Sequence, residues 1–290
     1  MDYRILGPLE VVDGDRPVAL GAERQRAVLA QLLLRPNEVV ASEWLIDELW
    51  GERPPPTAAK ILQNYVSQLR RALSANGGVG PLETHGRGYR LRVEPGALDL
   101  ERFEQRLESG REALAAGDAV RAAAEFRIGL AMWRGPPLPE LVGTTDAHVE
   151  IDRILERRVI ALEGRVEAVL ALGRHAELIG ELEAAVAHEP LRERLRAQLM
   201  LALYRSGRQA EALEVYRDGR RVLAEELGLE PGPELSRLEL AILEHHPALE
   251  PPPAPAPPRR AARGPPPGAS PRRPPACARA SASATAPRPC

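Results

Sequence analysis

The side chains best suited to recognise another molecule recur within one stretch of the sequence, residues 58–73. Six polar residues share one face of a helix over this stretch: Lys60, Gln63, Asn64, Ser67, Arg70 and Arg71. Asparagine and glutamine can bond an adenine edge at two points, arginine and lysine can reach guanine or phosphate, and serine can serve either. The face has no acidic side chain and is therefore suited to DNA. An ordinary solvated helix face explains the same pattern, and the helix alone does not decide between the two.

The helix that must position these side chains is predicted from an apolar stripe. Four apolar residues recur at spacings of four, three and four: Leu62, Val66, Leu69 and Leu73. Such spacing is typical of one buried helix face. The central polar residues repeat these spacings two positions out of phase, which is about 200° around a helix. Prolines 54–56 cannot continue a preceding helix, and Thr57 is predicted to cap the new one with its hydroxyl.

A small sheet and two further helices are predicted before this helix. The predicted elements are one or two strands within residues 3–11, a turn at Asp13-Gly14-Asp15, a return strand through Val18 and Leu20, a helix at 23–34, an extended piece at Val39-Val40, and a helix at 43–50 capped by Ser42, with Gly51 at its C-terminal end. The Asp-Gly pair indicates a hairpin, and glycine is the usual residue after a helix end.

A glycine-rich hairpin is predicted after the helix at 58–73. Strand-type sequences at 81–84 and 89–93 flank the turn His85-Gly86-Arg87-Gly88. A sheet, three helices and a hairpin in this order predict a winged helix-turn-helix over residues 1–95. Arg87 at the hairpin tip can reach a minor groove or a phosphate. The alternative for Arg87 is a solvated turn residue.

Between Pro95-Gly96 and residue 250, helices and no strands are predicted. Gly173 and Gly207 lie 34 residues apart in similar surroundings, which is the period of tetratricopeptide (TPR) helix pairs, and Gly117 indicates an earlier unit. Stacked helix pairs bury their apolar faces against each other. Residues 96–250 therefore predict an all-α, TPR-like domain. Its concave surface can bind a partner, or the array can act as a spacer or dimerisation arm.

The charges are unevenly distributed over the 290 residues, whose net charge is −2. Residues 1–95 carry 12 basic and 12 acidic groups, residues 96–250 carry 20 and 29, and residues 251–290 carry seven arginines and no acid. Because the first region is neutral, DNA binding there must depend on local placement. The last region is rich in Pro, Ala and Arg and has no aliphatic side chain larger than alanine. We therefore expect a disordered tail at 251–290.

Residue types exclude several catalytic and metal sites. Cys277 and Cys290 both lie in the tail, so neither a disulfide framework nor a zinc site is predicted. Lys60 is the single lysine and follows two alanines, which excludes a P-loop. The histidines have no Ser, Cys or Asp at a recognisable catalytic spacing. We expect no enzyme, cofactor or metal site. The absence of a signal peptide and of an 18-residue apolar run predicts a cytoplasmic protein without a membrane partner.

These residues resemble one known family. RILGPLEV, QRAVLAQLLLRPNEVV, LIDELWG, NYVSQLRRAL and THGRGYRL are similar to the DNA-binding domain of the SARP family, the Streptomyces antibiotic regulatory proteins, over nearly all of residues 3–93. LDLERFEQ, ALAMWRGPPL, ALGRHAEL and the run from EPLRERL to EPGPEL are similar to that family's bacterial transcriptional activator domain, over about 98–250. The resemblance implies a mainly α fold with small β-sheets, in which an OmpR-type winged helix precedes the helical domain.

The resemblance also implies a function. It implies an activator of an antibiotic biosynthesis cluster, bound as a homodimer to double-stranded promoter DNA at direct repeats, that recruits RNA polymerase holoenzyme. Because the chain has no P-loop and no receiver domain, we expect the small two-domain type without phosphoryl-transfer control. The alternative function is a protein-interaction scaffold. A helix that docks a protein would more often expose apolar or aromatic side chains where the six polar residues stand.

Overall fold

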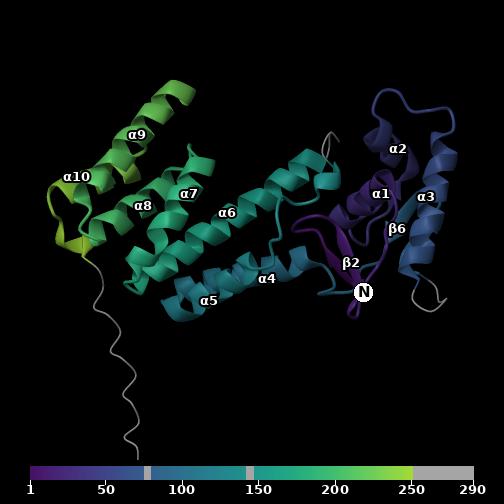
Figure 1. The fold of residues 1–290 in the computed structure, drawn as a ribbon, viewed down its shortest axis with the longest axis horizontal. Coiled ribbons are helices and arrows are strands. Elements are labelled where there is room, and N and C mark those ends of the chain that lie inside the picture. Colours follow the sequence, from purple (N-terminus) through teal and green to yellow (C-terminus); the bar gives the residue numbers. More distant parts are fainter. Residues whose placement is uncertain (75–79, 142–146, 251–290) are drawn as a thin grey trace, which may run out of the picture. The chain divides into compact units, whose positions relative to one another are not determined.

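The structure is a computed structural model that describes residues 1–74, 80–141 and 147–250 (Figure 1). The predicted disordered tail at 251–290, with both cysteines, lies outside the described residues. Within them the chain is mainly helical with two small sheets, as predicted. By their contacts, these described residues belong to one compact unit.

The first sheet contains three short antiparallel strands. These are β1 (Asp2–Arg4), β2 (Glu10–Asp13) and β3 (Arg16–Pro17), in the order β1-β2-β3. Tyr3 lies opposite Val11. The predicted hairpin is confirmed, but its return strand ends at Pro17. The N–H of Val18 still donates to Val11 at 2.8 Å, outside the strand.

Three helices follow: α1 (Glu23–Leu34), α2 (Ser42–Trp50) and α3 (Ala58–Leu73). The first and third have the predicted bounds, and the second begins one residue early. Both predicted side-chain caps are wrong. The strand β4 (Val40–Ala41) runs directly into α2, so Ala41 occupies the N-cap position and Ser42 is already helical. Thr57 has φ −100° and ψ 11° and its hydroxyl makes no cap hydrogen bond, because a capping side chain needs extended backbone at this position.

The hairpin predicted after α3 is present and gains a third strand. Strands β5 (Leu82–His85) and β6 (Gly88–Leu91) are joined by Gly86-Arg87, and the sheet has the order β4-β6-β5. The backbone of β4 approaches Gly88 so closely that an added Cβ would lie 2.5 Å from the Val40 carbonyl oxygen. Glycine at 88 therefore lets the piece before α2 pair with the wing. We use "wing" for residues 82–91.

The rest of the described chain is helical. The elements are α4 (Asp99–Ala115), α5 (Ala119–Leu130), the 3-10 turn η2 (Pro139–Leu141), α6 (Ala147–Ala171), η3 (His175–Leu178), α7 (Ile179–His188), α8 (Glu193–Arg205), α9 (Gln209–Leu227), α10 (Pro233–Leu243) and η4 (Pro247–Leu249). In Figure 1, α4 and α5 lie side by side and α6 packs along them.

The predicted repeat turns are confirmed at three glycines. Gly117, Gly173 and Gly207 have φ values of 75°, 74° and 76°. The residue after each glycine donates its N–H to the carbonyl five positions earlier, which is the Schellman hydrogen bond of a helix end. An L side chain rarely adopts this φ, so each glycine ends one helix and lets the chain reverse into the next.

The core of the winged helix continues past residue 95. Leu138, Leu141 and Ala147 are fully buried in the same hydrophobic cluster as α1 and α3. The carboxylate of Asp99 accepts the backbone N–H groups of Ile5 at 2.8 Å and Leu6 at 3.1 Å. Burial raises the pKa of Asp99 above its usual value, although these two hydrogen bonds oppose the shift. The domain boundary at 95/96 stays a prediction, and packing is continuous across it.

Candidate nucleic-acid interface

Helix α3 is held in place by the predicted apolar stripe. Leu62, Val66, Leu69 and Leu73 are at most 2 % exposed, and the helix packs against α1, α2 and β5. With this face fixed in the core, the opposite face is fixed toward solvent.

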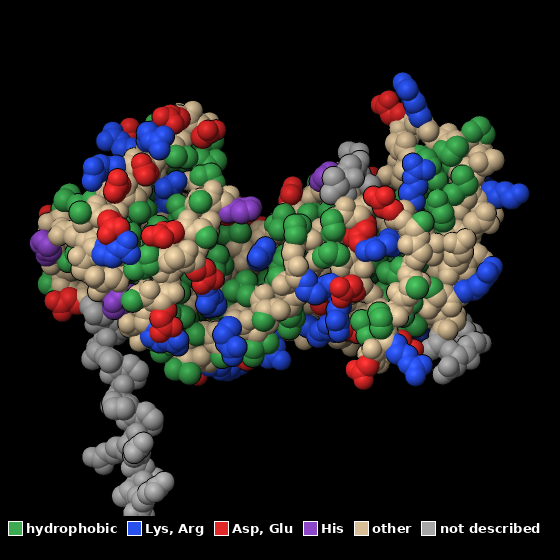
Figure 2. All heavy atoms as spheres, in the orientation of Figure 1, with side chains coloured by type: hydrophobic (Ala, Val, Ile, Leu, Met, Phe, Trp, Pro, Cys, Tyr) green, Lys and Arg blue, Asp and Glu red, His purple; other side chains and the backbone are tan. Residues whose placement is uncertain are grey.

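The structure exposes the predicted polar face. Five of its six members are exposed: Lys60, Gln63, Asn64, Ser67 and Arg71. Neither Lys60 nor Arg71 forms an ion pair with any residue that the structure describes. Figure 2 shows basic side chains projecting along the side of the winged helix on which α3 lies in Figure 1. The face therefore presents free amide, hydroxyl and cationic groups together.

Arg70 differs from the other five residues, because its guanidinium is turned to the wing. Its Nε donates to the Leu82 carbonyl at 2.9 Å and its Nη2 donates to the Thr84 hydroxyl. The side chain thus joins α3 to strand β5. An arginine with these two partners is better suited to hold the wing against the helix than to contact a base.

Gln68 is exposed on the same helix and was missed by the sequence analysis. It lies four residues after Asn64, so the two side chains are neighbours on the helix surface. At 100° per residue it is nearer than Gln63 or Arg70 to the point opposite the buried apolar stripe. The i+4 spacing from Asn64 was the signal that could have identified it.

The negative charge of Glu83, the acidic residue of the wing, is offset by neighbouring basic side chains. Glu83 accepts hydrogen bonds from Arg90 at 2.6 and 3.1 Å and lies 3.0 Å from the His85 ring. The hydrogen bonds from His85 and Arg90 lower the pKa of Glu83 to about 2. Arg87 is exposed at the tip, outside this network. Its backbone carbonyl accepts the Ser42 N–H at 2.9 Å, which fixes the tip beside the start of α2.

Neither a metal-ligand cluster nor a membrane-spanning helix is found in the described part of the chain. Within residues 1–74, 80–141 and 147–250, no three His, Cys, Asp or Glu side chains are grouped to hold a metal ion. None of the helices there is long and apolar enough to cross a bilayer.

Comparison with known proteins decides the family. The family model "Transcriptional regulatory protein, C terminal" matches residues 15–91, and the model "Bacterial transcriptional activator domain" matches residues 98–243. Regulatory protein DnrI of Streptomyces peucetius is 39% identical over 257 residues, covering 86% of this chain and 94% of DnrI. The chain belongs to the SARP family. Its relatives in this family are transcriptional regulators and not enzymes.

SARP relatives differ greatly in length. Regulatory protein AfsR of Streptomyces coelicolor is 44% identical over 248 residues, which are 85% of this chain and 24% of AfsR. The chain thus spans about a quarter of the AfsR relatives it matches. A solved structure of Mycobacterium tuberculosis EmbR in complex with a low-affinity phosphopeptide is 37% identical and has a TM-score of 0.80. The match covers 87% of this chain and 66% of that one.

Proposed function

We propose that this SARP chain is a sequence-specific DNA-binding transcriptional activator whose α3 enters the major groove. The observation that carries the proposal is the exposed, acid-free polar face of α3, fixed opposite a fully buried stripe. An α-helix fits the major groove, where each base pair presents its own pattern of donors and acceptors. The exposed face offers no apolar or aromatic anchor of the kind that docks proteins.

The side chains have different proposed roles. Asn64, Gln63 and Gln68 contact base edges, and Ser67 contacts a base or a phosphate. Lys60 and Arg71 contact phosphates and set the position of the helix on the duplex. Arg70 positions the wing, and Arg87 at its tip contacts a phosphate or the adjacent minor groove.

The wider function is a proposal that rests on membership of the family. We infer that two protomers bind direct repeats of a promoter in the cytoplasm and recruit RNA polymerase holoenzyme through the helical region. The genes controlled are those of an antibiotic biosynthesis cluster, as the name of the family indicates. Transcription in vitro by a bacterial holoenzyme, with and without the protein on its selected DNA site, tests the activation step. An unchanged transcript yield would contradict recruitment.

The DNA-binding step is tested with a duplex selected from random sequences by the wild-type protein. The selected motif also gives the repeat spacing. We expect Asn64→Ala to relax preference at one base pair, costing about 1–3 kcal/mol on the preferred duplex. Gln105→Ala, at an exposed position of α4, is the matched control and should leave the preference unchanged. Selection of no motif, or an unchanged motif with Asn64→Ala, would contradict base contact by α3.

A further inference from the structure

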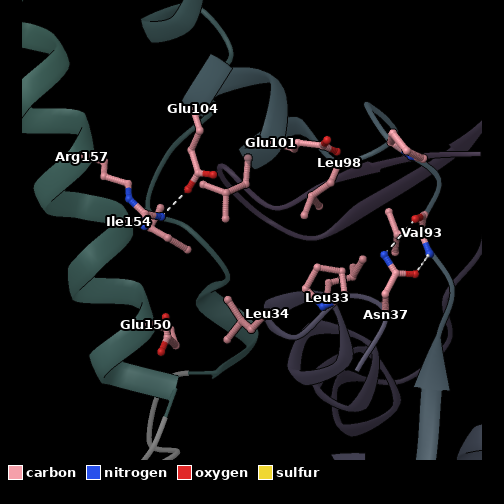
Figure 3. A pocket seen from close by; sticks show the side chains of 13 residues that line it. Leu33, Leu34, Asn37, Val93, Leu98, Glu101, Glu104, Glu150, Ile154 and Arg157 are labelled. Carbon is pink, nitrogen blue, oxygen red and sulfur yellow. Dashed lines mark hydrogen bonds and ion pairs between the residues drawn. The ribbon is translucent and has the colours of Figure 1, made fainter. Parts of the chain in front are cut away.

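A cavity lies between the end of α1 and the helices α4 and α6 (Figure 3). Its volume is about 370 Å³, within the usual range of small-molecule sites. Much of its wall is apolar: Leu33, Leu34, Val93, Leu98, Leu100 and Ile154. Asn37 frames one side, and its amide is already satisfied by the backbone N–H and carbonyl of Val93 at 3.0 and 3.1 Å. The apolar wall can therefore cover an apolar group without leaving this amide unpaired.

The charged groups of the wall are mainly acidic. Glu101, Glu104 and Glu150 line the cavity with one basic residue, Arg157. Arg157 forms an ion pair with Glu104, so these two charges offset each other. Glu101 accepts the Gly96 N–H at 2.7 Å, a neutral partner that leaves its charge in place.

Glu150 has a basic partner outside the wall. It lies 2.7 Å from Arg153, whose side chain is 63% exposed and does not line the cavity. Exposed pairs of this kind interact weakly. The cavity therefore combines an apolar wall with a residual negative charge.

We propose that this cavity binds a small amphipathic cation, an amine that carries an aromatic or aliphatic group. The apolar group packs against the leucines, and the ammonium is attracted to the carboxylates of Glu101 and Glu150. A carboxylate ligand would be repelled by the same groups. A neutral ligand would partly dehydrate the carboxylates and supply no charge in return. Ligand binding in this cavity does not depend on DNA binding, because the cavity and the polar face of α3 have no residue in common.

The ligand would contact segments far apart in the sequence. Residues 33–37 and 93–95 belong to the winged helix, and residues 98–104 and 150–157 belong to the helical region. A ligand held by both favours the state in which they are packed together, by its differential affinity for that state. The same binding stabilises the folded chain by mass action.

The test is a titration of the full chain with tryptamine as the probe, followed by backbone amide NMR shifts. Indole-3-acetate and 3-methylindole carry the same ring with an opposite charge and with no charge. We expect saturable shifts confined to residues 33–37, 93–104 and 150–157. We also expect tryptamine to bind at least tenfold more tightly than indole-3-acetate and more tightly than 3-methylindole. Shifts elsewhere only, no saturation, or equal binding of the two charged probes would overturn the proposal.

Two variants show whether the carboxylates supply the attraction. Glu101→Gln keeps an acceptor oxygen for the Gly96 N–H, and Glu150→Gln removes a charge near the surface, so both are expected to fold. Each should weaken tryptamine binding about threefold or more and leave 3-methylindole binding unchanged. Glu108→Gln, an exposed position of α4 outside the cavity, is the control and should change neither. In a double variant that combines Glu101→Gln and Glu150→Gln, unchanged tryptamine binding with an unchanged amide spectrum would contradict binding of the cation by these carboxylates.

Discussion

Two adjacent arginines of α3 illustrate how far residue type alone determines a role. Arg70 and Arg71 both belong to the polar face in the sequence, and only Arg71 is exposed in the structure. Arg70 donates to the carbonyl of Leu82, which lies 12 residues further along the chain. Local spacing predicts the exposure of the other five residues, because a helix repeats regularly. These are Lys60, Gln63, Asn64, Ser67 and Arg71. The diversion of Arg70 depends on where the wing folds back, and local spacing holds no information about that.

This difference predicts opposite phenotypes for two alanine variants. Arg71→Ala should lower the slope of log affinity against log salt by about one unit on any duplex, with little change in stability. Arg70→Ala should leave the slope nearer to wild type and cost about 1–3 kcal/mol of unfolding free energy, because bonds from a charged donor are lost. Salt titrations and urea unfolding separate the two effects. Arg111→Ala, at an exposed position of α4, controls for loss of one positive charge. Equal slopes for Arg70→Ala and Arg71→Ala would contradict the division of roles.

The carboxylate of Glu83 gives a second prediction at the scale of a residue. Its pKa is lowered to about 2 in the folded wing by His85 and Arg90, against 4.5 for an ordinary glutamate. The ionised carboxylate therefore stabilises the folded wing. This contribution to folding stability is fully present above about pH 4.5 and is lost as the pH falls toward 2. Carbon-13 NMR titration of the side-chain carboxyl should give this low value, and Arg90→Ala should move it upward. A wild-type Glu83 that titrates at 4.5 would show that these neighbours do not hold the charge.

At the scale of elements, the helices were more predictable than their caps and the pairing of their neighbouring strands. The bounds of α1 and α3 follow from apolar periodicity and from the prolines and glycines that flank them. The caps at Ser42 and Thr57 were wrong because the backbone entering each helix decides the geometry, and Ala41 enters α2 from a strand. The pairing of β4 with β6 joins Val40 to Tyr89. Only the folded path of the chain brings these two segments together, so no local pattern predicts the third strand.

Packing between α4, α5 and α6 depends on two glycines beside one aromatic ring. The Phe126 side chain of α5 is 1% exposed. A Cβ added at Gly110 of α4 would lie 2.7 Å from this ring, and one added at Gly164 of α6 would lie 2.5 Å from it. We expect Gly164→Ala to cost about 1–3 kcal/mol by overpacking, although alanine favours a helix over glycine. Gly180→Ala in α7 meets no atom within 4 Å and is the control. It should be neutral or slightly stabilising in urea unfolding, and a neutral Gly164→Ala would contradict the close packing.

At the scale of the whole described chain, the winged helix and the helical region share a core. The hydrogen bond from Ile5 to Asp99 joins residues 94 positions apart, and Arg26 of α1 forms an ion pair with Glu140 of η2. The sequence indicated a boundary at Pro95-Gly96 because the strand pattern ends there. No local pattern indicated that Leu138, Leu141 and Ala147 complete the first core, since an apolar residue does not specify which core it joins.

The shared core predicts that a substitution in the helical region weakens the winged helix. Leu141 is fully buried in the cluster that contains α1 and α3, so Leu141→Ala should cost about 2–5 kcal/mol through lost burial and a residual cavity. Native-state hydrogen exchange should show lower protection for amides of α1 and α3. Leu182→Ala is the matched control, because Leu182 of α7 is also fully buried but belongs to a different cluster. It should lower protection around α7 and α8 while α1 and α3 keep theirs. If Leu141→Ala instead left α1 and α3 fully protected, residues 1–95 would be an independent folding unit, and the contacts across residue 95 would contribute little to holding α3.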